Sequence, residues 1–327
     1  MAVLRPPVWL TIGGRFRREP SPVSDERPLP NSFLYGLTVA IWGTSWYVIT
    51  LQTGVVPVAV AIAYRFLLAA TILIAFCLAT RRRLNYGARD HLFMAIQGVC
   101  LFSLNYILFY MASLDMPSGL MAVCFSTVSL MNIANGTLFF RSPVDIRVLF
   151  GALLGLCGLT FVFWPEIAAF GLHGKPAIGL ALSLIATYLA SLGNMVTVRH
   201  KRAGVPLVES NAIGMAYGAI CSLIVAAILQ APIVFDARPV FTLALIYLAV
   251  VASIVGFGAY LTLIHRIGAD RAAYTTVLFP VVALGVSTWR EDYRWTALAG
   301  AGVALVLLGN VIVLMRRKFT IEEPLTT

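Results

Sequence analysis

Arg65 is the residue whose side chain is hardest to place in this sequence. It follows Pro57 by eight residues inside an apolar run, about 12 Å along a helix that rises 1.5 Å per residue. A guanidinium at that depth in a membrane costs about 2.5–3.5 kcal/mol, and no Asp or Glu lies comparably deep. Arg65 would therefore bind backbone carbonyls, water or a substrate anion such as an amino-acid carboxylate. The alternative is a structural tie between helix ends, with the side chain extended to the outer surface.

Two tyrosines one helical turn apart form a second candidate binding surface. Tyr106 and Tyr110 could stack on an apolar ligand while their hydroxyls hydrogen-bond its polar head. Asn105, beside Tyr106, adds a polar amide. A belt of aromatic residues at the membrane surface is the alternative, and it suits Tyr110 better than the deeper Tyr106.

Two further segments could line the same cavity. Ser253, Gly256 and Tyr260 are three and four residues apart and share one face of a helix. Trp42 in the first apolar segment could face them, although packing within a helix bundle is the more frequent use of a single tryptophan. We expect Trp42 and Tyr260 to contact the substrate.

Pro280 lies in the middle of an apolar segment and removes the backbone hydrogen bond to the carbonyl of Thr276. The freed carbonyl, together with the Thr276 hydroxyl, could bind a ligand or water, or the helix could bend there as a hinge. A static kink is the alternative. We expect Thr276 to contact the substrate and Pro280 to act as the hinge.

Five small polar residues form a stripe on the segment 177–199. Their spacing of four, four, three and three places them on one side of a helix: Ser183, Thr187, Ser191, Asn194 and Thr197. Lipid cannot satisfy such groups, so the stripe faces protein or water, and it either contacts ligand or holds helices together. On this helix we expect Tyr188, Ser191 and Asn194 to contact the substrate.

The composition indicates an integral membrane protein. Of 327 residues, 60% are hydrophobic and 12% are charged, whereas soluble domains have about 45–50% and about 25%. The net charge of +10 would suggest a nucleic-acid partner for a soluble protein, but here the basic residues gather between apolar segments, so none is expected. The five cysteines lie in apolar runs without a C-x-x-C pair, so neither a disulfide nor a metal site is expected.

Missing motifs narrow the mechanism. The sequence has no G-x-x-x-x-G-K-[ST], no G-x-S-x-G and no H-E-x-x-H, which excludes the ATP-driven and hydrolytic sites that these motifs form. We therefore expect no catalytic residue, no enzyme activity and no cofactor. No apolar segment has a central Asp or Glu that could relay protons, so facilitated export or another form of coupling stays open.

Ten apolar segments each have about the twenty residues that cross a bilayer core. They cover 33–52, 57–80, 90–112, 117–140, 145–165, 177–199, 206–230, 239–264, 270–290 and 294–315. A break with Pro and Gly at 166–176 predicts a linker between a first five-helix repeat at 32–165 and a second at 177–315. Tails at 1–31 and 316–327 flank them, and the first is expected to be disordered or to rest on a membrane surface.

The basic residues fix the expected orientation. With the N-terminus inside, 19 of the 24 Lys and Arg lie on the cytoplasmic side, as the positive-inside rule requires, and both termini are cytoplasmic. An odd number of spans in each half makes the second half inverted relative to the first. A shift of 151 residues also superposes Gly151 and Gly158 on Gly302 and Gly309. Inverted repeats form a transport site at the membrane midplane and allow alternating access.

Several motifs resemble a known family. The segments GADRAAYTTVLFPVVALGVSTWRED (268–292) and RWTALAGAGVALVLLGN (294–310) are similar to its pattern G-x-x-x-A … P … E … W … G-x6-G. Further similarities are Trp42-Gly43, Arg65-Phe66 and NYILFY at 105–110. Over residues 33–315 the chain resembles the ten-helix drug/metabolite transporter superfamily, in its EamA-type branch. The first repeat departs from the pattern, because Phe140 stands where the second has Glu291 and Ser129 where it has Pro280.

The resemblance implies export of small metabolites across the bacterial inner membrane, and several members of the family export amino acids. We therefore expect an all-α, multi-pass inner-membrane protein that exports small metabolites, with amino acids (broad-range or aromatic) as substrates. The alternatives are an exporter of multiple drugs or lipophilic compounds, which would need an acidic site in the membrane, and a non-transporting scaffold, which would not need Arg65. The expected partners are the substrate and lipid, and the protein is either a monomer or a homodimer.

Overall fold

Helices form all the regular structure in the residues that the structure describes. The computed structural model describes residues 29–140, 146–170, 174–267 and 275–314, and these contain no β-strand. Within these ranges, six helices are long and apolar enough to cross a membrane. The expected all-α membrane class is confirmed at this level.

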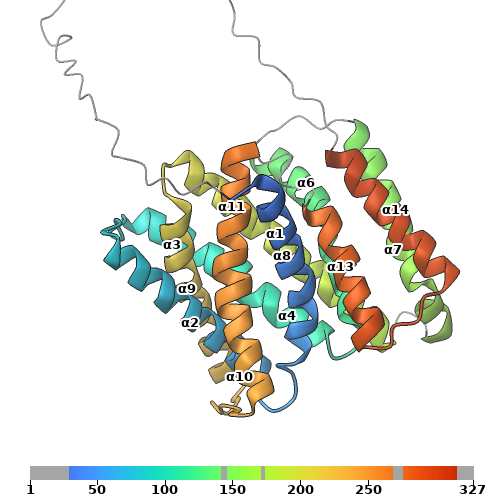
Figure 1. Ribbon diagram of the computed structural model, residues 1–327, viewed down its shortest axis with the longest axis horizontal. Coiled ribbons are helices and arrows are strands. Elements are labelled where there is room, and N and C mark those ends of the chain that lie inside the picture. The colour runs from blue at the N-terminus through green and yellow to red at the C-terminus, as the bar shows by residue number, and fades with distance from the viewer. Residues whose placement is uncertain (1–28, 141–145, 171–173, 268–274, 315–327) are drawn as a thin grey trace, which may run out of the picture. The chain divides into compact units, whose positions relative to one another are not determined.

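The helices follow the order that the colours show in Figure 1. Before residue 171 they are α1 (Asn31–Thr50), α2 (Val58–Ala79), α3 (Ala88–Val99), η2 (Cys100–Leu104), α4 (Asn105–Ala112), α5 (Ser118–Ser126), α6 (Val128–Phe140) and α7 (Ile146–Phe170). After residue 173 they are α8 (Lys175–Arg202), α9 (Leu207–Ile228), α10 (Pro239–Ile246), η3 (Tyr247–Val255), α11 (Gly256–Ile267), α13 (Thr275–Arg290) and α14 (Ala297–Leu314). Each of the ten expected apolar segments overlaps one of these helices or a continuous run of them.

Prolines mark where several helices begin. Pro57, Pro117 and Pro206 each stand directly before the first residue of a helix. Proline has no N–H to leave unpaired there, and its fixed φ suits the first turn. Pro165 does not end its helix, because α7 continues past it to Phe170 and α8 begins at Lys175. The segment between α7 and α8 is therefore shorter than the expected linker of 166–176.

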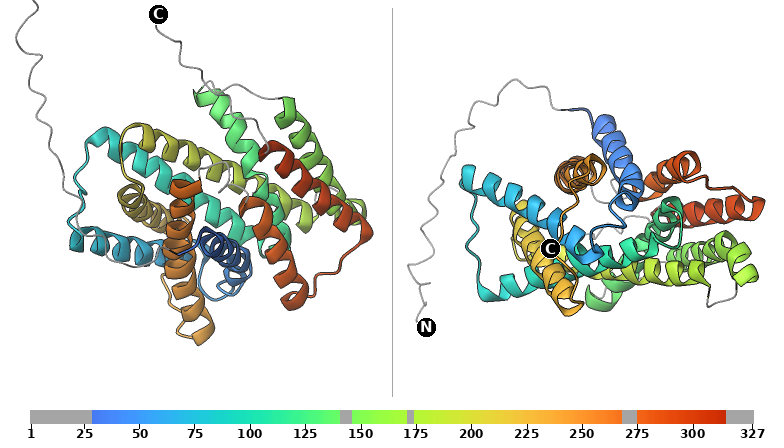
Figure 2. Two further views of the ribbon diagram at one scale, coloured as in Figure 1. Left: turned by 45° about the horizontal axis from the view of Figure 1, so that its top comes forward. Right: turned by 90° about the horizontal axis from the view of Figure 1, so that it is seen from below.

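The helices α7 and α14 pack together through glycines and lie side by side in Figures 1 and 2. A Cβ atom on Gly158 would lie 2.6 Å from the carbonyl oxygen of Gly302, and one on Gly309 would lie 2.6 Å from that of Gly151. Only a hydrogen atom fits at such distances. Because the lower-numbered glycine of α7 meets the higher-numbered glycine of α14, the two helices run antiparallel.

Two spanning segments contain a π-helical stretch in the middle of an α-helix. The stretch η2 lies between α3 and α4, and η3 lies between α10 and α11. A π-helical turn contains an extra residue, so some carbonyls lose their usual partner and accept hydrogen bonds from side chains. In η3 the hydroxyl of Ser253 donates to the carbonyl of Leu248, at 2.8 Å.

Glu291 ties α13 to the start of α5. Its Oε2 atom accepts hydrogen bonds from the backbone N–H of Ser118, at 3.0 Å, and from the Ser118 hydroxyl, at 2.7 Å. Ser118 is the first residue of α5, so the carboxylate satisfies one of the N–H groups that the start of a helix leaves unpaired. The contact joins the two parts of the chain that precede and follow residues 171–173.

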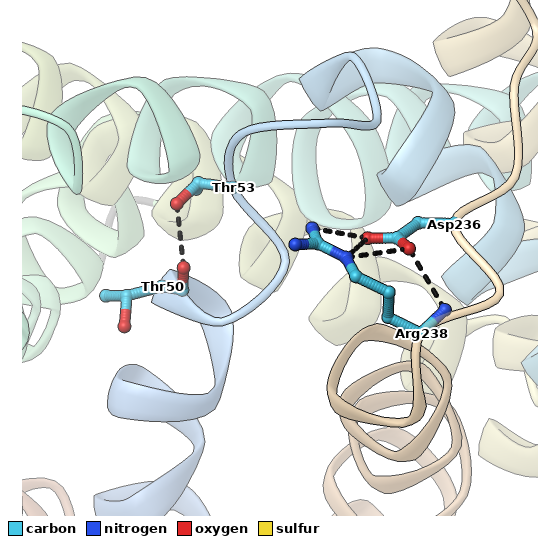
Figure 3. A network of polar contacts seen from close by, with 4 residues as sticks. All are labelled: Thr50, Thr53, Asp236 and Arg238. Atoms are coloured by element: carbon cyan, nitrogen blue, oxygen red, sulfur yellow. Dashed lines mark hydrogen bonds and ion pairs between the residues drawn. The ribbon is translucent and has the colours of Figure 1, made fainter.

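Local polar contacts order two of the connections between helices (Figure 3). The Thr53 hydroxyl donates to the carbonyl of Thr50 at 2.7 Å, just after α1. Before α10, Arg238 donates from Nε to Asp236 at 2.9 Å and from Nη2 at 2.7 Å. These side-chain hydrogen bonds lower the pKa of the Asp236 carboxyl from its ordinary value. The pair therefore fixes the chain where α10 begins.

Candidate functional site

Arg65 lies in the interior between helices from both parts of the chain. Its side chain is 2% exposed. It donates to the Ser253 hydroxyl from Nε at 3.3 Å and from Nη2 at 3.2 Å, and Nη2 also contacts the Tyr106 hydroxyl at 3.4 Å. The guanidinium carbon lies 4.3 Å from the centre of the Tyr106 ring, a distance at which a cation is attracted to an aromatic face. The side chain does not extend to the outer surface.

Ser253 is oriented by the π-helical stretch to accept from Arg65. Its hydroxyl has one proton, which it donates to the carbonyl of Leu248. The lone pairs of the oxygen are then left for the two Arg65 nitrogens. The π-helical geometry of η3 therefore leaves a carbonyl free to accept from Ser253. It also orients the Ser253 hydroxyl toward Arg65.

Several buried polar atoms of Arg65 and of other candidate residues have no hydrogen-bond partner. The Nη1 atom of Arg65 is one, and no ion pair joins Arg65 to a carboxylate of the described residues. Arg65 also interacts electrostatically with Tyr110, whose hydroxyl donates to Gln52 Oε1 at 2.6 Å. Gln52 Nε2 and Asn105 Oδ1 are unpartnered as well. Buried polar atoms are normally satisfied, so Arg65 Nη1 can donate a hydrogen bond to a polar ligand or water.

Trp42 and Tyr260 pack next to this group without contacting Arg65. Trp42 Nε1 donates to the carbonyl of Ala252, the residue before Ser253, at 3.4 Å. The centres of the Trp42 and Tyr260 rings are 5.0 Å apart. Gly256 leaves the space for this packing, because a Cβ atom there would lie 2.8 Å from Trp42 Nε1. Trp42 thus supports η3 next to Ser253, and Tyr260 packs against Trp42.

Ser191 and Asn194 of the polar stripe on α8 face α6. Asn135 Nδ2 donates to the Ser191 hydroxyl at 2.9 Å, and Asn194 Nδ2 donates to Asn132 Oδ1 at 3.3 Å. These bonds hold helices together, as one of the two interpretations of the stripe expected.

Tyr188 is the candidate that the structure separates from the others. Its side chain is 44% exposed, on the outside of α8, whereas Ser183, Thr187 and Ser191 are fully buried. Tyr188 is one position beyond Thr187, and one residue turns a helix by about 100°. It therefore lies to the side of the stripe, and its contact with a ligand stays a prediction.

Pro280 and Thr276 lie together in α13. The helix is continuous from Thr275 to Arg290 with Pro280 buried inside it. The Thr276 hydroxyl lies 3.2 Å from the hydroxyl of Ser129 in α6, so it contributes to the packing of α13 against the first part of the chain. Neither residue contacts Arg65 in a hydrogen bond.

An apolar groove lies next to Ser253, the hydrogen-bond acceptor for Arg65. We define it as the α2–α11 groove, a space of about 260 Å³ lined by side chains of α2, α9, η3 and α11. Its walls include Ile72 and Phe76 of α2, Asn211 of α9, and Ser253, Phe257 and Gly258. Ser253 is therefore shared between the groove and the hydrogen bonds of Arg65.

The comparison with protein families decides which class of membrane protein has this site. A model of the EamA-like transporter family matches residues 32–164 and 177–315. The chain belongs to this family. The resemblance seen in its motifs is thereby confirmed.

Relatives of this EamA-like transporter have names that agree with the family. A "Probable amino-acid metabolite efflux pump" of Escherichia coli (strain K12) is 28% identical over 294 residues, which cover 86% of this chain and 95% of that protein. A protein of the same name from Salmonella typhimurium is 26% identical over 291 residues, covering 86% and 94%. An "Uncharacterized inner membrane transporter YedA" of Escherichia coli (strain K12) is 28% identical over 281 residues, covering 82% and 87%.

A solved crystal structure has the same fold as the EamA-like transporter. Its TM-score is 0.63 at 18% sequence identity, and the match covers 86% of this chain and 95% of the other. The family and the relatives are transporters rather than enzymes. With several apolar helices in the chain, the expected location of the transporter in a bacterial inner membrane is confirmed.

Two residues of the site were not among the sequence candidates for substrate contact. The sequence places Ser253 with Gly256 and Tyr260 on a helix face that could line the cavity, but only Tyr260 is predicted to contact the substrate. Gln52 follows the first apolar helix, and apart from its amide near the helix end nothing in the sequence indicates that it belongs to the site. Both contact residues more than fifty positions away in sequence, which helical spacing alone does not reveal.

Proposed function

We propose that this transporter exports small metabolites with a carboxylate group, most of all amino acids of broad or aromatic type. One observation carries the proposal: Arg65 is buried, has an unpartnered Nη1 atom, and pairs with no carboxylate of the described residues. A substrate carboxylate would supply the missing charge, and charge-assisted hydrogen bonds to a guanidinium are among the strongest that proteins make. The Tyr106 ring would then pack against the guanidinium and lie beside the bound substrate.

We propose ten spanning helices in two inverted repeats, with both termini cytoplasmic. The glycine contacts support this arrangement, because a shift of 151 residues exchanges the pair Gly158–Gly302 with the pair Gly309–Gly151. Such an exchange is what a two-fold axis between antiparallel helices produces. The same shift carries the end of η2 at Leu104 onto the end of η3 at Val255. Repeats at 32–165 and 177–315 and tails at 1–31 and 316–327 agree with the two segments that match the family.

The proposed mechanism is alternating access about the Arg65 site. Arg65 belongs to the first repeat and its acceptor Ser253 to the second, so the hydrogen bonds between them join the two halves. A carboxylate that binds Nη1 and Nη2 competes with Ser253 for the guanidinium. Substrate binding would thereby weaken a contact between the halves and favour their movement. Pro280 in α13 is the proposed hinge for this movement.

Transport by the purified protein tests the proposal. The protein is placed in liposomes loaded with unlabelled amino acid, and the exchange of labelled aliphatic and aromatic amino acids is followed. We expect accumulation of label that depends on the protein. A flat time course across the whole panel contradicts the amino-acid proposal. Exchange of lipophilic cations without exchange of amino acids would instead favour the multidrug alternative.

A further inference from the structure

The α2–α11 groove shares the residue Ser253 with the Arg65 site but differs from that site in chemistry. At the end of the groove, Ser253 accepts hydrogen bonds from Arg65. The remaining walls are mostly apolar, with Ile72 and Phe76 on one side and Phe257 on the other. Asn211 is the other polar side chain that lines it. A mostly apolar groove whose wall includes Ser253, the acceptor for Arg65, is complementary to the apolar substituent of a carboxylate bound at Arg65.

The size of the groove suits a side chain rather than a large molecule. Its volume is about 260 Å³. An apolar cavity of about 150 Å³ is large enough for a benzene ring, whereas pockets for drug-sized ligands span roughly 300–1,000 Å³. The groove therefore has room for the side chain of leucine or phenylalanine beyond a carboxylate near Ser253.

Gly258 lines the groove and, being a glycine, places no side chain there. A Cβ atom on Gly258 would meet no atom within 4 Å, so a larger residue fits there without a clash. We propose that the α2–α11 groove is the subsite for the apolar side chain of the substrate, and that Gly258 sets the largest side chain the transporter accepts. The inference rests on the proposed function of the Arg65 site.

Filling the groove from Gly258 tests the proposal. In Gly258→Leu, the rate constant kcat/KM for exchange of phenylalanine should fall about tenfold or more, while that for alanine changes less than about twofold. Gly36→Leu is the matched control, since Gly36 is an exposed helical glycine of α1 with no atom within 4 Å of its Cβ position. This control should transport both amino acids as the unaltered protein does. A second variant, Ile72→Ala, widens the groove and should improve transport of the largest side chains relative to alanine.

A binding measurement separates the groove from the transport cycle. Phenylalanine should raise the thermal midpoint of the unaltered protein and of Gly36→Leu, but not of Gly258→Leu, whereas alanine should raise all three. Equal loss of alanine and phenylalanine in Gly258→Leu, or no change for either, overturns the subsite, and the second result would leave a lipid chain as the occupant. Absence of amino-acid transport by the unaltered protein removes the proposed function and the subsite with it.

Discussion

Arg65 in α2 donates two hydrogen bonds, from Nε and from Nη2, to the hydroxyl of Ser253 in η3. The two residues are 188 positions apart, one on each side of the proposed boundary between repeats. Ser253 can receive both bonds because its own proton is donated to the Leu248 carbonyl. These hydrogen bonds offset part of the free energy that burying the arginine costs. In the proposed mechanism, a substrate carboxylate replaces Ser253 as the acceptor.

Removing the Ser253 hydroxyl should destabilise the protein, because the buried Arg65 loses its acceptor. In Ser253→Ala, two guanidinium nitrogens lose their acceptor, and an unsatisfied buried group costs about 1–3 kcal/mol. We expect a lower thermal midpoint, and a larger rise of that midpoint on adding an amino-acid substrate than in the unaltered protein. Ser253→Thr keeps the hydroxyl and should behave nearly normally. An unchanged response to substrate in Ser253→Ala would contradict the competition between Ser253 and the carboxylate.

The close approach of α7 and α14 predicts a strong effect of one methyl group. In Gly158→Ala the new Cβ would lie 2.6 Å from the Gly302 carbonyl, so the helices must separate at a cost of about 1–3 kcal/mol. Thermal unfolding in detergent measures this cost. Gly36→Ala, on an open helix face, should unfold at or slightly above the normal temperature. Equal midpoints for the two variants would show that the glycine contact is unimportant.

Glu291 should contribute to stability through the start of α5. In Glu291→Ala the N–H and hydroxyl of Ser118 lose their acceptor, with an expected loss of about 1–2 kcal/mol. Glu291→Gln retains an acceptor without the charge and should fall between. The neighbouring Asp292 is exposed, so Asp292→Asn serves as control with little change in the thermal midpoint. A control as unstable as Glu291→Ala would rule out this specific contact.

Acidification should remove the contribution of the Asp236–Arg238 pair. Hydrogen bonds from Arg238 lower the pKa of Asp236 in the folded protein below its unfolded value. The stabilisation is therefore complete above the unfolded pKa, about 4, and is lost as the pH falls below it through the lowered folded pKa. Asp236→Asn should unfold at a lower temperature than the unaltered protein at pH 7, and the difference should shrink on acidification. A difference that stays constant or grows would oppose this assignment.

Local features of the site could be predicted because they depend on helical spacing. Burial of Arg65 in a long apolar run, and a tyrosine pair one turn apart, follow from positions within single segments. The contact between Arg65 and Tyr106, 41 positions apart, needed only that α2 and the next spanning segment be neighbours in space. Helix starts at Pro57, Pro117 and Pro206 were equally accessible, since proline acts on its own backbone.

Contacts between distant helices could not be predicted from spacing. Ser253 faces Arg65 because η3 contains an extra residue per turn, and no pattern in the apolar sequence Tyr247–Val255 indicates a π-helix. The stripe of α8 could contact ligand or other helices, and only the packed structure shows that Ser191 and Asn194 face α6. Tyr188 lies on the same helix as the stripe, but its position one residue beyond Thr187 turns its side chain outward.

The most direct test of the account compares two molecules that differ only in the carboxylate. Liposomes containing the unaltered protein, Arg65→Gln or the control Arg89→Gln are given phenylalanine and its decarboxylated amine, phenethylamine. We predict that the unaltered protein and the control transport phenylalanine at least about tenfold faster than the amine, and that Arg65→Gln loses this preference. Equal transport of both molecules by the unaltered protein, or an unchanged preference in Arg65→Gln, would contradict the assignment of Arg65 as the carboxylate site.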